Sequence, residues 1–312
     1  MRRGTRLFAS RPRSVLTPAA VDGPGKSSVA RLSIVSNSLL IVLKVAAGAV
    51  TGSIAILTEA MHSSIDLVAS VVAYFSVRKA DEPADESHLY GHAKLENLAA
   101  AIEGMLILVG AGVIVYEAVR RLVAGGDPVH SLGVGIAVIA FSAAVNIVVS
   151  TYMFRQARRH DSPALEGDAE HLRTDALTSV GVLAGLVLIE ITGWQQIDSI
   201  VALIVAGAIV YAALRILSRS SRVLVDEALP AEELDIVKAL IETYPGPELV
   251  GYHKLRARRA GSQRYVDVHV QFRSDTSLER AHEIAHELQN SLRERIPAAE
   301  MLVHMEPVRN PR

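Results

Sequence analysis

Two pairs of ionisable residues stand inside otherwise apolar stretches of the chain. His62 and Asp66 form one pair, His171 and Asp175 form the other, and both have the spacing His-x-x-x-Asp. Residues four apart share a helix face, and an ionisable group inside a membrane-spanning segment is by default a functional-site hypothesis. Two imidazoles and two carboxylates suit a tetrahedral divalent cation, with Zn²⁺ the leading candidate. The alternative is that each pair is only an interhelical hydrogen bond.

Two further groups of potential metal ligands lie outside these apolar stretches. One group, in a polar segment, is Asp85, His88 and His92. The other is spread over the C-terminal part of the chain and consists of His253, His269, His282, His286, His304 and Glu306. A solvated loop and an ordinary exposed surface give similar compositions, so spacing alone leaves both readings open.

The apolar stretches themselves have the length of membrane spans, since about 20 helical residues cross the hydrocarbon core. They are apolar on all sides, whereas the helices of a soluble protein have a polar face. Six spans place the second and fifth antiparallel, so that their His/Asp pairs can face one point. The stretches are 29–52, 54–78, 95–122, 131–154, 166–192 and 196–217.

Basic residues indicate how the spans are oriented. Arg and Lys precede the first span, border the second and fourth connections and follow the sixth span, while the opposite connections carry none apart from Arg120 and Arg121 just before one of them. The positive-inside rule therefore predicts both termini in the cytoplasm. The basic start has no apolar segment behind it, so we expect residues 1–26 to form a disordered cytosolic tail and the protein to lie in a cell (inner) membrane.

Composition excludes several classes of protein. The 312 residues are 50% hydrophobic and 21% charged, with a mean hydropathy of +0.29. The chain has no cysteine, which excludes a disulfide scaffold, thiolate metal sites and a cysteine nucleophile. A net charge of −1 and 4% aromatic residues argue against a nucleic-acid partner, and no phosphate-loop motif supports nucleotide-driven pumping.

After about Asp226 the pattern is that of a soluble domain. A helix is predicted from Pro230 to about Thr243, followed by strands at 249–258 and 264–273, a second helix from Leu278 and a last strand at 300–306. The order α-β-β-α-β predicts a small α+β domain with its helices on one face of a sheet. Its size, about 80 residues, is marginal for an independent core, so partner contacts are expected. We therefore expect an all-α six-helix transmembrane domain at 27–222 and a cytoplasmic α+β domain at 223–312.

Four stretches of this chain are similar to the cation diffusion facilitators, a family of six-helix, proton-coupled divalent-metal antiporters. The resemblance extends over roughly residues 27–308, and its specific part is the two His-x-x-x-Asp motifs together with Gly91-His92-Ala93-Lys94-Leu95-Glu96. The similar stretches are 52–66, 90–97, 171–179 and 225–230.

The resemblance implies a homodimer whose transport site is His62, Asp66, His171 and Asp175. Many bacterial members have Asp at the position of His62, and a His-Asp/His-Asp set is similar to that of zinc-preferring members. A salt bridge between Lys94 and Asp226 is implied at the junction of membrane and cytoplasm.

The resemblance also implies two metal sites outside the membrane. The first is a loop site at Asp85, His88 and His92. The second belongs to a metallochaperone-like cytoplasmic domain, where metal bridges the protomers through His253, His269, His282, His304 and Glu306.

We expect export of a divalent cation, foremost Zn²⁺, across the lipid bilayer by alternating access in exchange for protons. Metal ligands must be deprotonated, so binding of protons releases metal, and histidine titrates near neutral pH. Two alternatives stay open: a membrane metalloenzyme with Glu59 as general base, and a sensor or scaffold that binds metal without moving it. Flux across vesicles separates these cases.

Overall fold

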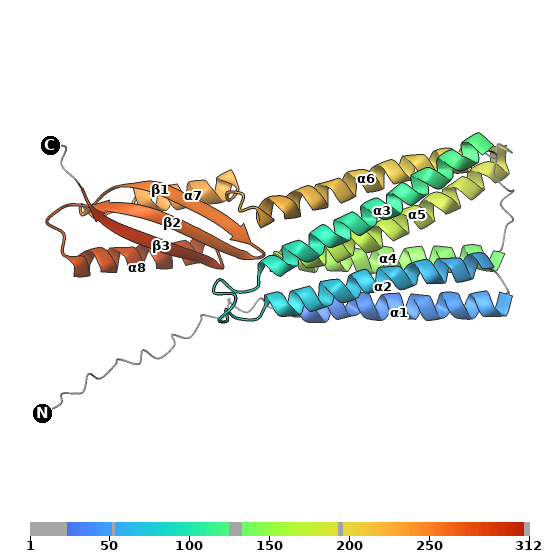
Figure 1. Cartoon of the computed structure of the whole chain (residues 1–312), viewed down its shortest axis with the longest axis horizontal. Coiled ribbons are helices and arrows are strands. Elements are labelled where there is room, and N and C mark those ends of the chain that lie inside the picture. The colour runs from blue at the N-terminus through green and yellow to red at the C-terminus, as the bar shows by residue number, and fades with distance from the viewer. Residues whose placement is uncertain (1–23, 52–53, 125–132, 193–195, 309–312) are drawn as a thin grey trace, which may run out of the picture.

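The computed structural model describes residues 24–51, 54–124, 133–192 and 196–308. The expected N-terminal tail lies almost wholly outside this part of the chain, as do the side chains of His62 and Glu59. The described residues form a bundle of long helices that leads into a small domain with a sheet (Figure 1). The helices of the bundle are α1 (Lys26–Thr51), α2 (Ile54–Ala80), α3 (Lys94–Ala124), α4 (Gly133–His160), α5 (Pro163–Thr192) and α6 (Gln196–Leu224).

Among the described residues, α1, α3, α4 and α6 are the helices long and apolar enough to cross a membrane. The structure extends α4 and α6 beyond the predicted apolar stretches, to His160 and Leu224. These extensions are basic, with Arg158, Arg159 and His160 in the last turn of α4. Cations at a helix C-terminus are stabilising, so the helices continue after their apolar part has ended.

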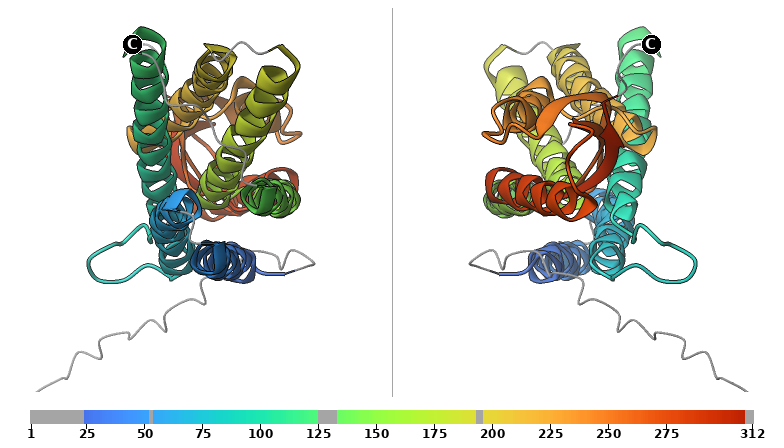
Figure 2. Two further views of the ribbon diagram at one scale, coloured as in Figure 1. Left: turned by 90° about the vertical axis from the view of Figure 1, so that its right-hand side faces the viewer. Right: turned by 90° about the vertical axis from the view of Figure 1, so that its left-hand side faces the viewer.

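Close packing of the helices depends on small residues. Gly104 on α3 faces the backbone of Ala213 and Leu217 on α6, where an added Cβ would lie 3.3 Å from backbone atoms of both. Small residues allow membrane helices to approach closely. End-on views show α1 and α2 on one side of the bundle and α6 on the other (Figure 2).

The cytoplasmic domain has the predicted order α-β-β-α-β. Strand β2 lies in the middle of the sheet, antiparallel to β1 and parallel to β3. Alternate residues of β2, Val266, Val268 and Val270, are buried against Ile284 and Leu288 of α8, so the helices cover one face of the sheet. The elements are α7 (Ala231–Glu242), β1 (Leu249–Ala260), β2 (Gln263–Phe272), α8 (Leu278–Arg295) and β3 (Ala299–Pro307).

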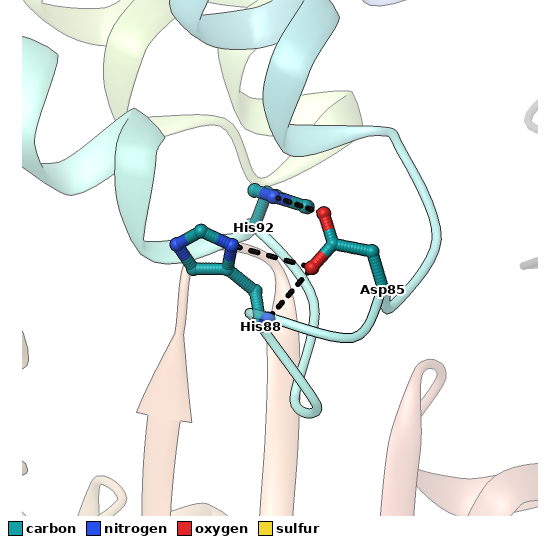
Figure 3. Close-up of side chains that lie close together, drawn as sticks. All are labelled: Asp85, His88 and His92. Carbon is teal, nitrogen blue, oxygen red and sulfur yellow. Dashed lines mark hydrogen bonds and ion pairs between the residues drawn. The ribbon is translucent and has the colours of Figure 1, made fainter.

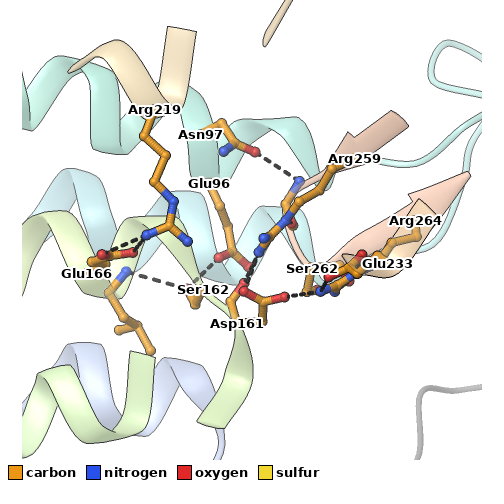
Figure 4. A network of polar contacts seen from close by, with 12 residues as sticks. Glu96, Asn97, Asp161, Ser162, Glu166, Arg219, Glu233, Arg259, Ser262 and Arg264 are labelled. Atoms are coloured by element: carbon orange, nitrogen blue, oxygen red, sulfur yellow. Dashed lines mark hydrogen bonds and ion pairs between the residues drawn. The ribbon is translucent and has the colours of Figure 1, made fainter. Parts of the chain in front are cut away.

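The turn between β1 and β2 docks against the helix bundle. Gly261 in this turn has φ +56, and its N–H donates to Oδ1 of Asn97 at 2.8 Å. A Cβ at Gly261 would lie 2.5 Å from the carbonyl oxygen of Ala93, so the turn requires glycine. Asp161, in the turn between α4 and α5, accepts a hydrogen bond from Arg259 of the hairpin and forms an ion pair with Arg264 (Figure 4).

Candidate metal centres

A buried centre lies between α2 and α5. Nε2 of His171 is 3.1 Å from Oδ1 of Asp66 on α2 and 4.0 Å from Oδ2 of Asp175, one turn further along α5. Each of the three side chains offers a ligand atom within 4.8 Å of the others. Asp66 and His171 are buried and Asp175 is half-buried. The structure therefore brings together three members of the predicted set. The fourth, His62, belongs to α2, but its side chain lies outside the described residues.

The geometry of this centre fits a shared cation. At metal–ligand distances of about 2.0–2.2 Å, two ligand atoms on a tetrahedral ion lie about 3.4 Å apart. The 3.1 Å between Nε2 of His171 and Oδ1 of Asp66 is close to that value, and the 4.0 Å to Oδ2 of Asp175 is somewhat longer. Nδ1 of His171 is buried without a hydrogen-bond partner among the described residues. Buried polar atoms are normally paired, whereas the ligand geometry of this centre involves the other ring nitrogen, Nε2.

A hydroxyl–carboxylate network lies next to this centre and was not predicted. Asp168 on α5 is fully buried, and its Oδ1 accepts hydrogen bonds from Ser33 on α1 at 3.1 Å and from Ser70 on α2 at 2.9 Å. Ser70 follows Asp66 by one helical turn and Asp168 precedes His171 by one turn. The network therefore ties together the two helices that carry the metal ligands. The one sequence signal for it is the i,i+3 spacing of Asp168 and His171 on a single helix face.

The connection between α2 and α3 holds a second centre (Figure 3). Asp85 lies between two imidazoles, with Oδ1 3.4 Å from Nδ1 of His88 and Oδ2 3.3 Å from Nε2 of His92. One ligand atom from each residue lies within 4.8 Å of the others. Gly91, with φ +78, makes the turn that brings His92 back toward Asp85. Three residues that are close in sequence thus converge on one point.

Hydrogen bonds favour the ionised form of the Asp85 carboxyl, which is the form that binds a metal ion. The Ser87 hydroxyl, together with the backbone N–H groups of His88 and Ser87, holds the pKa of the Asp85 carboxyl well below its usual range. The carboxylate is therefore ionised at neutral pH. His92 is buried, and in the described part of the chain neither of its ring nitrogens has a hydrogen-bond partner. An ionised carboxylate beside imidazole nitrogens suits a divalent cation.

A third centre is built on the sheet. Strand register places His253, His269 and His304 side by side on β1, β2 and β3. Glu306 joins them, with carboxylate oxygens 2.8 Å from Nε2 of His253, 2.7 Å from Nδ1 of His269 and 3.4 Å from Nε2 of His304. Hydrogen bonds with His269, and then with His253, lower the pKa of Glu306. We call these four residues the Glu306 cluster.

The resemblance also assigns His282 to this metal site, which is expected to bridge two protomers, so its role stays a prediction. His282 lies on α8, where its Nε2 is 3.1 Å from Nε2 of His286. Both side chains are exposed. Neither belongs to the group of close potential ligand atoms that His253, His269 and Glu306 form on the sheet.

The salt bridge implied at the junction is present. Nζ of Lys94 lies 2.7 Å from Oδ1 of Asp226, which Arg258 of β1 also approaches at 2.9 Å. Lys94, followed by Arg258, lowers the pKa of Asp226. The pair joins the start of α3 to the segment after α6, so it spans the boundary between bundle and cytoplasmic domain.

Apolar helices around a buried group of candidate metal ligands, joined to an α+β domain that carries further candidates, are typical of a multi-pass membrane protein that handles metal cations. Comparison with family models gives the same result. Residues 30–225 match the cation efflux transmembrane domain, and residues 229–308 match the cytoplasmic domain of cation efflux proteins. The chain belongs to the cation efflux family, a family of transporters, and the resemblance seen in the sequence is confirmed.

Alignments with individual relatives cover most of the chain. An uncharacterized transporter of Synechocystis is 33% identical over 270 residues, covering 86% of each chain. The cation-efflux pump FieF of Yersinia pestis (strain Pestoides F) is 32% identical over 270 residues, covering 86% of this chain and 89% of its own. A solved structure of the putative zinc transporter CzrB is 31% identical and covers 26% of this chain and 99% of its own, with a TM-score of 0.25.

Proposed function

We propose that the protein exports a divalent cation, foremost Zn²⁺, from the cytoplasm in exchange for protons by alternating access. The observation that carries the proposal is the convergence of Asp66, His171 and Asp175 inside the helix bundle. Nitrogen and oxygen ligands in this number suit a four-coordinate ion such as Zn²⁺. Membership of the cation efflux family supports transport as the outcome of binding.

His62 completes the transport site in this proposal. It precedes Asp66 by four residues within α2, so the two positions share a helix face. The site then has two imidazoles and two carboxylates, and the charge of the ion offsets both carboxylates. This offset matters because an uncompensated ionised group in a membrane helix costs about 2.5–3.5 kcal/mol on insertion scales.

Exchange follows from competition between cation and proton for the same atoms. Metal ligands bind in their deprotonated form, so a bound cation and bound protons exclude each other. Facing the cytoplasm, the site captures the cation. Facing a more acidic exterior, its imidazoles take up protons and the cation leaves. Rocking of helix groups about a site near the middle of the membrane supplies alternating access in secondary transporters.

The topology proposed for this function has six spans, α2 and α5 included, with both termini in the cytoplasm of an inner membrane. The basic residues at the cytoplasmic-domain end of the bundle support this orientation, because Arg78 and Lys79 lie in the last turn of α2 and Arg222 lies in the last turn of α6. We also propose a homodimer, which the match to the cytoplasmic domain of cation efflux proteins supports.

Regulation is proposed for the centres outside the membrane. Cytosolic cation bound by the Glu306 cluster, and by Asp85, His88 and His92, biases the conformational equilibrium of the bundle. The docked β1–β2 turn and the Lys94–Asp226 pair provide the physical link between the two domains.

Flux measurements on the purified chain in liposomes test the proposal. With an acidic lumen, we expect Zn²⁺ to accumulate inside against its gradient, and an ionophore that collapses the pH gradient should stop accumulation. Comparing Zn²⁺, Cd²⁺, Co²⁺, Mn²⁺ and Fe²⁺ gives the selectivity. Binding without transfer would make the protein a sensor or scaffold, and flux that ignores the pH gradient would exclude proton exchange.

A further inference from the structure

A carboxyl group without a partner lies inside the helix bundle. Glu103 on α3 is fully buried, and neither oxygen of its side chain has a hydrogen-bond partner among the described residues. Buried carboxyls are normally hydrogen-bonded, paired with a cation or neutralised by a proton. In the part of the chain that the structure describes, Glu103 has neither a donor nor a basic partner, so a proton is what neutralises it.

The fold makes room for this side chain. Helices α3 and α5 run side by side (Figure 1), and Gly167 of α5 faces Glu103. A Cβ at Gly167 would overlap Oε2 of Glu103 and would lie 3.2 Å from the Cα of Ala100. Glycine at this position therefore leaves the space between the two helices to the carboxyl group.

A second buried carboxyl lies next to the first. Asp168 follows Gly167 on α5, is fully buried, and is the charged group that acts on Glu103. Its Oδ1 accepts the hydroxyl groups of Ser33 and Ser70, whereas its Oδ2 has no partner among the residues described. Two neighbouring helices thus present carboxyl oxygens that are free to hold or pass a proton.

Other charged groups on the elements around Glu103 have partners of their own. The pairs are Asp66 with His171, Lys79 with Glu82, Glu166 with Arg219, Glu170 with Arg215, and Glu96 with Lys26. None of these pairs includes Glu103, and Asp168 is its ionisable neighbour.

The two carboxyls lie between the metal centre and the cytoplasmic domain. Helices α3 and α5 both begin at the end of the bundle that leads into this domain (Figure 1). Glu103 and Asp168 lie in the first third of their helices, and Asp168 precedes His171 by about one turn. A proton that leaves the metal centre toward the cytoplasm therefore passes this level of the bundle.

We propose that Glu103 and Asp168 release protons from the transport site to the cytoplasm. This inference rests on the proposed exchange of a cation for protons. Glu103 first gives its O–H proton to water on the cytoplasmic side. Asp168 takes up a proton that leaves the site when the cation binds, and passes it to the carboxylate of Glu103. Each transfer breaks one bond to hydrogen and forms another, and both carboxyls return to their starting state.

Glu103→Gln tests this role, because an amide keeps the shape of the protonated carboxyl but cannot release a proton in its place. Two measurements are made on the full chain in liposomes with radiolabelled Zn²⁺. Accumulation driven by an acidic lumen requires proton release on the opposite side. Counterflow, the exchange of labelled for unlabelled Zn²⁺ at equal pH, requires no net movement of protons.

We expect Glu103→Gln to lose the accumulation driven by the pH gradient and to keep counterflow. Glu103→Asp retains a carboxyl and should still accumulate Zn²⁺, more slowly than the wild type. Glu117→Gln is the matched control, since it makes the same substitution near the other end of α3, where Glu117 pairs with Arg120 and Arg121. This variant should keep both activities.

Accumulation at the wild-type rate in Glu103→Gln overturns the proposal. Loss of accumulation and counterflow together, with unchanged size-exclusion elution, also overturns it, because Glu103 would then be needed to move the cation itself. Counterflow without pH-driven accumulation in the wild type would overturn the proposed exchange, and the role of Glu103 with it. The two failures are therefore distinguished by the wild type alone.

Discussion

Nε2 of His171 lies 3.1 Å from Oδ1 of Asp66, although the two residues are 105 positions apart in the chain. The contact joins α2 to α5, and each helix carries one His-x-x-x-Asp pair. It places Asp66 of the first motif beside His171 of the second. The proposed exchange of a cation for protons depends on this meeting of an imidazole and a carboxylate inside the bundle.

Replacing His62 with Asp should change which cation is moved without stopping transport. A carboxylate in place of an imidazole makes the ligand set harder, which favours ions such as Mn²⁺ relative to Zn²⁺. The measurement is the ratio of initial flux rates for these two ions in liposomes. Met61→Leu, at an exposed neighbouring position, is the control. An unchanged ratio in His62→Asp would show that His62 is not a ligand.

Asp168→Ala should weaken the contact between the helices that hold the transport site. The buried carboxylate accepts hydrogen bonds from Ser33 and Ser70, and a buried polar group left without its partner costs about 1–3 kcal/mol. We expect a lower midpoint of thermal unfolding in detergent and weaker Zn²⁺ binding. Asp168→Asn keeps an acceptor oxygen and should recover most of both losses. Equal stability of wild type and the alanine variant would contradict this role.

Gly261→Ala should loosen the docking of the cytoplasmic domain. The backbone at this residue has φ +56, and the new Cβ would lie 2.5 Å from the carbonyl oxygen of Ala93. The left-handed conformation alone costs about 1–2 kcal/mol for a residue with a Cβ. We expect faster proteolysis near residue 226. Gly251→Ala, where a Cβ meets only Oε1 of Gln271 at 3.5 Å, should behave as wild type, and equal cleavage rates in both variants would refute the docking role.

Acid should weaken the junction between the domains through Asp226. Lys94, and then Arg258, lower the pKa of this carboxyl in the folded protein, so its stabilising effect is present above the ordinary Asp pKa, about 3.9. That effect is lost as the pH falls through the lower folded value. Asp226 is largely exposed and its ion pairs are screened by salt, so the effect should be small.

The measurement is the midpoint of thermal unfolding between pH 5 and pH 3 for the wild type and for Asp226→Asn, at low ionic strength. Other carboxyls titrate in both proteins, so the difference between the two curves isolates Asp226. The wild type should lose more stability than the variant over this interval. Parallel curves would mean that the Lys94–Asp226 pair contributes nothing to the folded state.

The elements of the fold were largely predictable because their signals are local. Apolar length predicts the helices of the bundle, and the order α-β-β-α-β of the cytoplasmic domain follows from turn residues and periodicity. The ends of α4 and α6 were placed too early, since their basic last turns are helical without being apolar. Hydropathy marks where apolar residues stop, whereas hydrogen bonding and the helix dipole decide where a helix stops.

The part of each candidate site that could be predicted from the sequence differs from site to site. Asp85, His88 and His92 are close in sequence, so a single turn at Gly91 brings them together. Asp168 was missed because its partners, Ser33 and Ser70, belong to other helices and carry no motif. His282 was assigned by resemblance to a metal site that bridges two protomers, and the structure of a single chain leaves that assignment a prediction.

The most direct test of the central claim is proton-coupled Zn²⁺ flux in liposomes for Asp66→Ala and for Asp175→Ala, measured beside the wild type in one preparation. Each variant removes one carboxylate from the shared site. We expect flux to fall to the level of protein-free liposomes in both, while size-exclusion elution matches that of the wild type. Retained proton-coupled flux in either variant would contradict transport through a cation held between α2 and α5.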